Sequence, residues 1–217
     1  MSESWKEVIT SVAKERAVGE SQERWGQGPG ERPRFNYRLE HVKAVVAIAR
    51  GLAHRLGGDL EVVEAAAWLH DLSKSCDHWP EGDSHGAAGA EEARRLLERT
   101  DFPQGKVALV CEAIAKHPGL YKEEPIEPLA AAILWDADKL SKLGATSLVH
   151  FLCSAPSSEE PPTTESILAQ GEEWLSLAAR IASSMTTAPA KEMAQERHET
   201  VKVFYQQLKK EMGWDRG

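Results

Sequence analysis

Polar side chains of the types that bind metal ions occur next to apolar helical segments of this chain. His70 and Asp71 directly follow the apolar run Ala66–Leu69. Charged residues are rarely buried without a partner, so a carboxylate that continues an apolar segment is expected to meet a cation. A local helix cap beside a core histidine would account for the same dipeptide. The pair alone therefore does not separate a metal site from a structural role.

Two further residues of this kind lie on other predicted helices. His41 shares a helical face with Val45 and Ile48, and Asp138 lies in the apolar segment around Leu134. Three helices thus each direct a histidine or a carboxylate toward a core. Two imidazoles and two carboxylates suit iron, manganese, zinc or magnesium, with positions left for water and substrate. The four residues that we expect to hold metal are His41, His70, Asp71 and Asp138.

The ordered pattern His, His-Asp, Asp resembles the HD-domain superfamily of metal-dependent phosphohydrolases. The segments that carry the resemblance are Glu40–His41, Leu69–Lys74 and Trp135–Leu140. From residue 41 to residue 138 the pattern spans somewhat less than half of the chain, and it implies metal roles for the four residues above. In the third segment the family's ligand precedes a basic residue and a leucine. That rule selects Asp138 and leaves Asp136 as a supporting or surface residue.

Two more histidines lie where some HD proteins hold a second metal ion, bridged by the aspartate of the His-Asp pair. YqeK-like dinucleoside polyphosphate hydrolases and the HD-GYP cyclic-dinucleotide phosphodiesterases are such proteins, and the segment His85–Ala90 resembles the first of these. The second histidine is His117. Alternatively, His85 is an ordinary helix-start residue and His117 is a helix-end histidine near the C-terminal dipole. The resemblance implies a dinuclear centre with iron favoured, or a divalent site for manganese, magnesium, cobalt, zinc or nickel.

Basic residues near the motifs are the expected partners of phosphate. Arg38 lies three residues before His41, and Lys74 lies three residues after Asp71. With Asp71 they form the predicted catalytic set, in which the two cations neutralise charge on phosphoryl oxygens. Lys139 is a less favoured candidate of the same kind. A solvated surface position is the alternative for each of these basic residues.

The resemblance predicts hydrolysis of a phosphoester or phosphoanhydride bond in a small nucleotide-like substrate by a metal-activated water. Two other functions stay open. Some HD proteins with the same ligand types hold a diiron centre and are oxygenases. A non-catalytic HD domain that senses a nucleotide is the second alternative, although no member of the core ligand set is missing here.

The composition limits the partners of the chain. Its 217 residues carry a formal net charge of -8, which disfavours binding to polymeric nucleic acid but permits a small phosphorylated substrate in a local cationic pocket. The three cysteines form no CxxC pair, and the N-terminus shows no apolar signal core, so we expect a cytoplasmic protein without a membrane span. The Glu/Lys-rich segment Lys191–Lys210 is either a homodimer contact or a solvated helix.

Helical periodicity dominates the chain and predicts an all-α fold. We expect an HD-domain helical bundle over residues 35–155. It follows an N-terminal helix and Gly/Pro-rich loop over 1–34, and a helical extension over 156–217 packs on it. A capping box of Ser4 and Glu7 is predicted to start the first helix, which should end near Val18. The expected helices span about 4–18, 38–56, 59–73, 84–99, 103–117, 128–152, 163–185 and 189–212.

Overall fold

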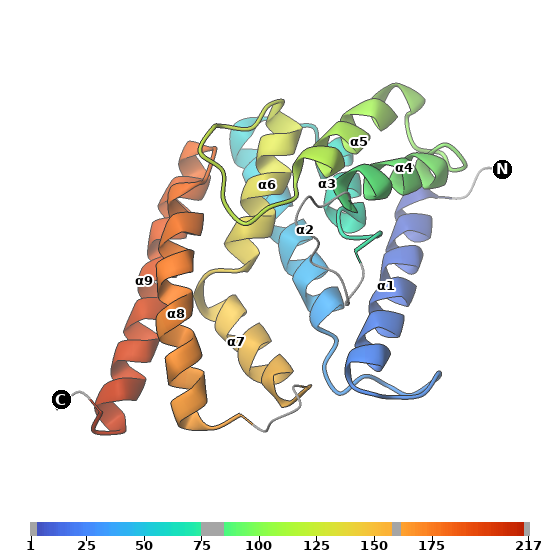
Figure 1. Ribbon diagram of the computed structural model, residues 1–217. Coiled ribbons are helices and arrows are strands. Elements are labelled where there is room, and N and C mark those ends of the chain that lie inside the picture. Colours follow the sequence, from blue (N-terminus) through green and yellow to red (C-terminus); the bar gives the residue numbers. More distant parts are fainter. Residues whose placement is uncertain (1–3, 75–84, 158–161, 215–217) are drawn as a thin grey trace.

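The computed structural model describes residues 4–74, 85–157 and 162–214, and the regular elements in these ranges are helices (Figure 1). The prediction of an all-α fold is confirmed. No helix in the described ranges combines the length and the apolar character that a membrane crossing requires. The elements are α1 (Trp5–Arg24), α2 (Tyr37–Leu56), α3 (Leu60–Leu69), α4 (His85–Leu97), η1 (Gln104–Lys106), α5 (Val107–Lys116), α6 (Leu129–Ser141), α7 (Gly144–Ser154), η2 (Ala155–Ser157), α8 (Thr164–Ser183) and α9 (Ala188–Glu211).

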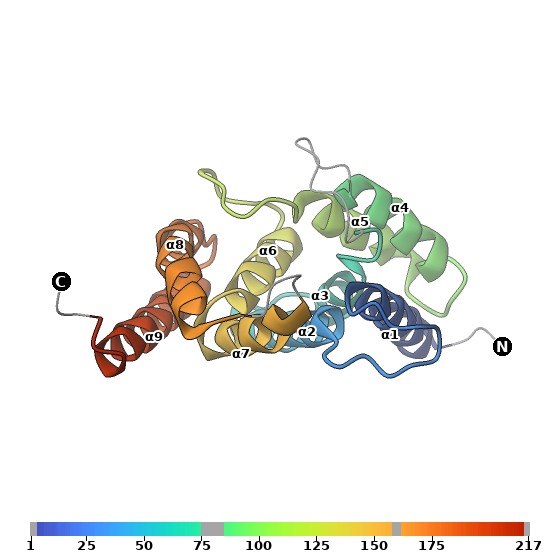
Figure 2. The same ribbon diagram turned by 60° about the horizontal axis from the view of Figure 1, so that its bottom comes forward.

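The main hydrophobic core surrounds α2 and α3. In Figures 1 and 2, α2 lies between α1 on one side and α6 and α7 on the other. Its buried apolar residues recur at the helical spacing of three and four positions, as in Val42, Val45, Val46 and Ala49. The α3 helix is buried along nearly its whole length. Its first turn is capped by the Asp59 carboxylate, which accepts hydrogen bonds from backbone N–H groups of that turn.

A smaller hydrophobic cluster joins the C-terminal helices to α7. The α8 and α9 helices run antiparallel and pack on α7 and α6 (Figure 1). A Cβ atom at Gly171 would lie 2.1 Å from the Tyr205 ring, so only glycine lets this ring lie directly against α8. The buried residues of the cluster are Leu148, Leu168, Val201 and Tyr205.

The first helix is longer than predicted. It continues to Arg24, and the loop that was expected to begin at Gly19 is correspondingly shorter. Gly19 is exposed, with no atom near the position of a Cβ, and a single glycine in a helix costs only about 1 kcal/mol relative to alanine. Ser4 occupies the N-cap position, but its side chain makes no capping hydrogen bond, so the predicted capping box with Glu7 is wrong.

The single helix predicted over residues 128–152 is two helices, α6 and α7. The chain turns at Gly144, whose φ of 78° lies in the left-handed region that glycine adopts without steric cost. A Cβ at this position would also lie 2.9 Å from the Arg197 side chain of α9. Among the other bounds, α3 ends at Leu69 and Pro103 precedes the short η1 turn. The predicted loop over 76–82 and the cap at Ser84 lie outside the described residues.

Asp136 is not a surface residue: it is buried and connects α6 to the start of α9 by hydrogen bonds. Its side chain is fully buried. Its two carboxylate oxygens accept hydrogen bonds from the backbone N–H groups of Thr186 at 2.7 Å and Thr187 at 2.8 Å. The carboxylate therefore holds the C-terminal helices on the helix that carries Asp138.

We predict that Asp136→Asn lowers the free energy of unfolding by about 1–3 kcal/mol, because the amide accepts at only one atom and leaves a buried N–H unpaired. Urea unfolding measures the loss, and metal content should stay unchanged. Glu196→Gln, on the exposed face of α9, is the control. Loss of metal at unchanged stability would instead assign Asp136 to the metal site.

Candidate metal centre

Six side chains predicted as metal ligands meet where the ends of several helices converge. The structure places His41 near the start of α2, Asp138 within α6 and His85 at the first residue of α4. The remaining histidines are the C-cap residues of α3 and α5. Within the described residues, the ligand atoms of each of two groups lie within 4.8 Å of one another. The groups are His41, His70 and Asp138, and Asp71, His85 and His117.

In the first group the imidazole nitrogens face each other. His41 Nε2 lies 3.3 Å from His70 Nε2 and 3.3 Å from Asp138 Oδ1. Asp71 Oδ2 lies 3.5 Å from His41 Nε2 and 3.6 Å from His70 Nε2. Two histidines and two carboxylate oxygens therefore surround one point.

The second group repeats the arrangement around the other oxygen of the same aspartate. His85 Nε2 lies 3.2 Å from His117 Nε2. Asp71 Oδ1 lies 3.5 Å from His117 Nε2 and 4.0 Å from His85 Nε2. Since its two oxygens face different groups, the Asp71 carboxylate stands between the two sites as a bridging ligand would.

Backbone carbonyls at two helix ends determine which ring nitrogen carries the proton. His70 Nδ1 lies 2.9 Å from the carbonyl oxygen of Ala67, and His117 Nδ1 lies 2.6 Å from that of Ile114. A carbonyl oxygen only accepts, so each Nδ1 is the donor and each Nε2 keeps its lone pair. Outer hydrogen bonds of this kind orient histidine ligands in metal sites.

Ser141 has the same effect on His41. Its hydroxyl donates to the Asp138 carbonyl oxygen at 2.6 Å, so its oxygen accepts from His41 Nδ1–H at 3.0 Å. The Nε2 lone pair of His41 consequently points at that of His70. Two facing lone pairs cannot hydrogen-bond to each other, and a shared cation satisfies both.

Burial keeps the first two imidazoles neutral. It lowers the pKa of His41 to about 4, with a further contribution from the Lys142 ammonium. Burial likewise lowers the pKa of His70 to about 3. Both rings are unprotonated at neutral pH, the form that binds a metal ion.

The two carboxylates stay ionised because buried cations accompany them. Burial alone would raise the pKa of Asp71, but the Arg38 guanidinium in contact with this carboxylate holds it well below its usual range. Burial opposes ionisation of Asp138 in the same way, and Lys139 and Lys142 hold its pKa well below the usual range.

Lys139 is fully buried and not a solvated surface charge. Its ammonium contacts Asp138 Oδ2 and donates to the His117 carbonyl oxygen at 3.1 Å. Burial lowers the pKa of Lys139 to about 8. Lys142 contacts the other oxygen, Asp138 Oδ1. Sequence reasoning missed Lys142, although its position four residues after Asp138 was a usable signal for a helical ion pair.

Arg38 lies between two carboxylates. Its Nε and Nη2 atoms donate to the two oxygens of Glu20 at 2.6 Å and 2.9 Å, and its Nη1 contacts Asp71 Oδ2. Lys74 Nζ lies 3.8 Å from Asp71 Oδ1. These side chains line a cavity of about 570 Å³ between α1 and the start of α2. Glu20 was missed because the sequence placed it in a loop.

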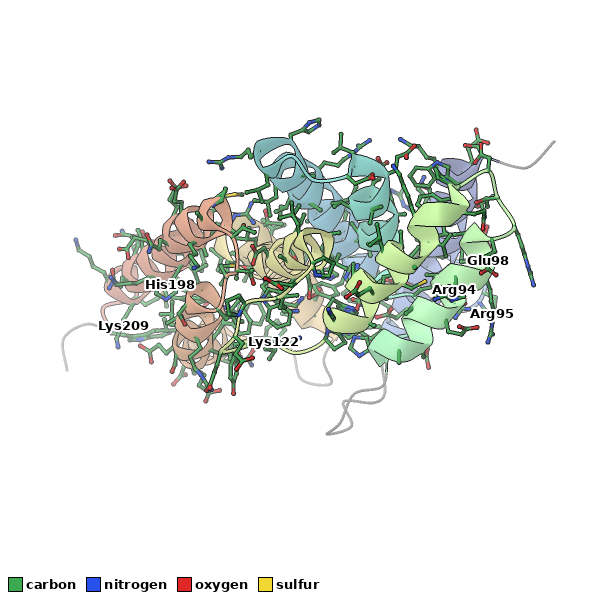
Figure 3. All side chains as sticks on the ribbon, turned by 90° about the horizontal axis from the view of Figure 1, so that it is seen from above. Arg94, Arg95, Glu98, Lys122, His198 and Lys209 are labelled. Carbon is green, nitrogen blue, oxygen red and sulfur yellow. The ribbon has the colours of Figure 1, made fainter. Side chains whose placement is uncertain are left out.

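The histidines without a predicted partner stay apart from the centre. His54 is exposed on α2, and Figure 3 shows His198 on α9, at the opposite end of the molecule from Arg95 on α4. His150 is buried, with its ring 5.7 Å from that of Tyr37. His78 and Trp79 lie outside the described residues. Trp25 donates from Nε1 to the Phe35 carbonyl oxygen at 2.8 Å, as a loop anchor does.

We predict that protein purified without chelator and without air contains two metal ions per chain, one for each ligand group. His85→Ala should retain one ion because it removes a ligand of the second group only. Asp71→Ala should retain none because it removes the shared carboxylate. Elemental analysis per chain measures this, with His54→Ala as the control. Two ions in His85→Ala protein would show that the second group is not a metal site.

The metal-free protein should lose stability as the pH falls from 7.5 to 5. The unfolded chain protonates His41 and His70 near pH 6.5, whereas the folded chain keeps them neutral down to about 4 and 3. Their contribution is therefore fully present above pH 6.5 and is lost below it, by about 2–4 kcal/mol at pH 5. Urea unfolding in chelator tests this. His70→Gln should flatten the profile and His54→Gln should not; a flat wild-type profile would contradict the prediction.

Comparisons with known proteins agree with this geometry. Residues 38–143 match the family model described as the HD domain, a range that includes all six predicted ligand residues. Ribonuclease Y of Cutibacterium acnes is 37% identical over 105 residues, and that of Chloroflexus aurantiacus is 36% identical over 103 residues. Each match covers 48% of this chain but only 17% and 18% of the relative, so the chain spans less than a fifth of their length.

Several crystal structures match nearly the whole chain. A predicted HD-superfamily hydrolase from an uncultured Thermotogales bacterium is 25% identical, with a TM-score of 0.60, over 94% of this chain and 91% of that one. An HD-superfamily hydrolase from Bacillus thuringiensis is 22% identical, with a TM-score of 0.63, over 99% and 100%. Bacillus subtilis YpgQ in complex with ADP is 23% identical, with a TM-score of 0.61, over 92% and 97%. The matched segment, the shared helical fold and the paired groups of candidate ligands lead to one assignment: residues 38–143 of this chain are an HD domain.

Proposed function

We propose that this protein is a metal-dependent phosphohydrolase that cleaves a phosphoester or phosphoanhydride bond in a small nucleotide-like substrate. The observation that carries the proposal is the pair of facing Nε2 groups on either side of the Asp71 carboxylate. Metal ions bound there supply a water that ionises near neutral pH and polarise the phosphoryl oxygens. A centre so rich in imidazole suits iron, manganese, cobalt, zinc or nickel better than magnesium, and we propose iron for the dinuclear form.

The side chains around the centre have distinct roles in this proposal. Asp71 presents one oxygen to each ligand group. Arg38 holds the orientation and charge of Asp71 from the outer side, because its guanidinium contacts that carboxylate. Arg38 and Lys74 also line the cavity beside Asp71. Their positive charges there would neutralise the negative charge of phosphoryl oxygens.

Three observations favour a small nucleotide over an RNA chain. YpgQ, which matches this chain over nearly its full length, was crystallised with ADP. The ribonuclease Y relatives share less than half of this chain. The net charge of -8 also lacks the cationic excess with which proteins displace counterions from a polynucleotide.

Phosphate release from nucleoside mono-, di- and triphosphates and dinucleoside polyphosphates tests the proposal, with protein loaded anaerobically with iron, manganese or cobalt. We expect metal-dependent release that Asp71→Ala abolishes. Arg38→Ala and Lys74→Ala should each lower kcat/KM about 10–100-fold, because each removes a charge beside the phosphoryl group. Lys43→Ala, an exposed lysine on the outer face of α2, is the control.

Other outcomes separate the rival functions. If the iron-loaded protein consumes oxygen and releases no phosphate, the function is that of an oxygenase and not of a hydrolase. Nucleotide binding without turnover under any metal would indicate a sensor.

A further inference from the structure

A second cavity, of about 450 Å³, is lined by Arg24 at the end of α1, by Tyr37 at the start of α2 and by residues of the later helices. Figures 1 and 2 show α1 on one side of α2 and α7 on the other, with α8 and α9 beyond α7. Much of its wall comes from α7, α8 and α9, outside the segment 38–143 that matches the HD domain. The aromatic and imidazole rings that line it are Tyr37, His150, Phe151, Trp174 and Tyr205.

The inner end of this cavity touches the metal centre. The Tyr37 ring stacks on the His41 ring, with centroids 5.9 Å apart and planes within 7°. Ser141, which accepts from His41 Nδ1, lines the cavity, and so does Lys142, which contacts Asp138. A ligand in the cavity is therefore separated from two ligand residues of the first metal group by single side chains.

The walls of the cavity are mostly apolar and contain several flat rings. His150 meets Tyr37 edge to face at 81°, and burial lowers the pKa of His150, so this wall is an uncharged ring at neutral pH. Tyr205 rests directly on α8 because Gly171 has no side chain. A volume of a few hundred Å³ with such walls is typical of small-molecule sites.

Besides Ser141 and His150, the polar residues that line the cavity are Arg24, Lys142, Ser147, Ser154 and Gln170. The Gln170 amide on α8 offers both a donor and an acceptor, and the Ser147 hydroxyl lies on α7. Lys142 adds an ammonium at the inner end. Flat apolar walls, an amide and a cation toward the metal centre match the faces, the edge and the phosphates of a nucleotide.

We propose that this cavity binds the heteroaromatic base of the substrate, with the phosphates directed past Lys142 to the metal centre. The inference rests on the proposed function and names its substrate class more narrowly: a nucleotide recognised through its base by the C-terminal helices. An aliphatic phosphate or pyrophosphate would use the metal centre without filling this cavity.

The test fills the cavity from α7 without touching the metal ligands. Ser147→Phe places a ring where the base would lie, and Ala145→Phe adds the same ring at an exposed position of the same helix as the matched control. Calorimetry of the full-length, manganese-loaded protein compares the non-hydrolysable α,β-methylene analogue of ADP with pyrophosphate. Elemental analysis verifies the metal content of each variant.

We expect Ser147→Phe to weaken binding of the ADP analogue about tenfold or more while pyrophosphate binding and metal content stay at wild-type values. Ala145→Phe should change the affinity for neither ligand. Gln170→Ala, at an exposed position of the cavity rim, should weaken binding of the ADP analogue several-fold. It provides a second variant if Ser147→Phe does not fold.

Equal losses for both ligands, no loss for the analogue, or wild-type binding of ribose 5-phosphate as tight as that of AMP would each overturn the inference. Failure of the proposed function looks different. Suppose that the wild-type protein binds the analogue through this cavity but releases no phosphate from ADP or any other substrate. The proposed hydrolase function would then be wrong, and the proposed base-binding site would stand.

Discussion

The helix packing of this protein must hold the imidazoles of the candidate metal centre in fixed orientations. An acceptor at Nδ1 fixes the ring orientation of a histidine and leaves its Nε2 lone pair for a metal ion. His70 and His117 solve this alike, each as a helix C-cap that bonds the carbonyl three residues earlier. The ends of α3 and α5 must therefore lie side by side. The packing of the hydrophobic core around these helices brings them there.

Charge is the second constraint on this centre. Two ionised carboxylates and several cations lie out of water, and buried charges are tolerated only when each has partners at close range. Asp138 meets Lys139 and Lys142, and Asp71 meets Arg38. Arg38 in turn needs Glu20 from α1. Each ion pair joins a further segment of the chain to the centre. The buried charges therefore require the helix packing that brings their partners together.

The all-helical class and the convergence of the six candidate ligands could be predicted because both leave local or ordered signals: apolar periodicity, and His-Asp motifs at the ends of apolar runs. The residues that were missed act through space. Nothing around Glu20 in the sequence announces a partner eighteen positions later, and the early end assigned to α1 hid it. The division at Gly144 also places this glycine against the Arg197 side chain of α9, a contact that no local pattern reveals. The surface alternative for Asp136 is wrong because its carboxylate accepts from backbone N–H groups about fifty residues away, which no local pattern reveals.

The pairing of Glu20 with Arg38 has a consequence for how this fold can be divided. The segment that matches the HD domain begins at residue 38. The Glu20 carboxylate, which pairs with the buried Arg38, therefore lies outside this segment. A chimaera that inherits only that segment would carry an arginine whose second partner is missing, beside the aspartate that both metal groups share. Recombination between relatives therefore has its natural boundary before α1, and the N-terminal helix and the HD segment are expected to be inherited together.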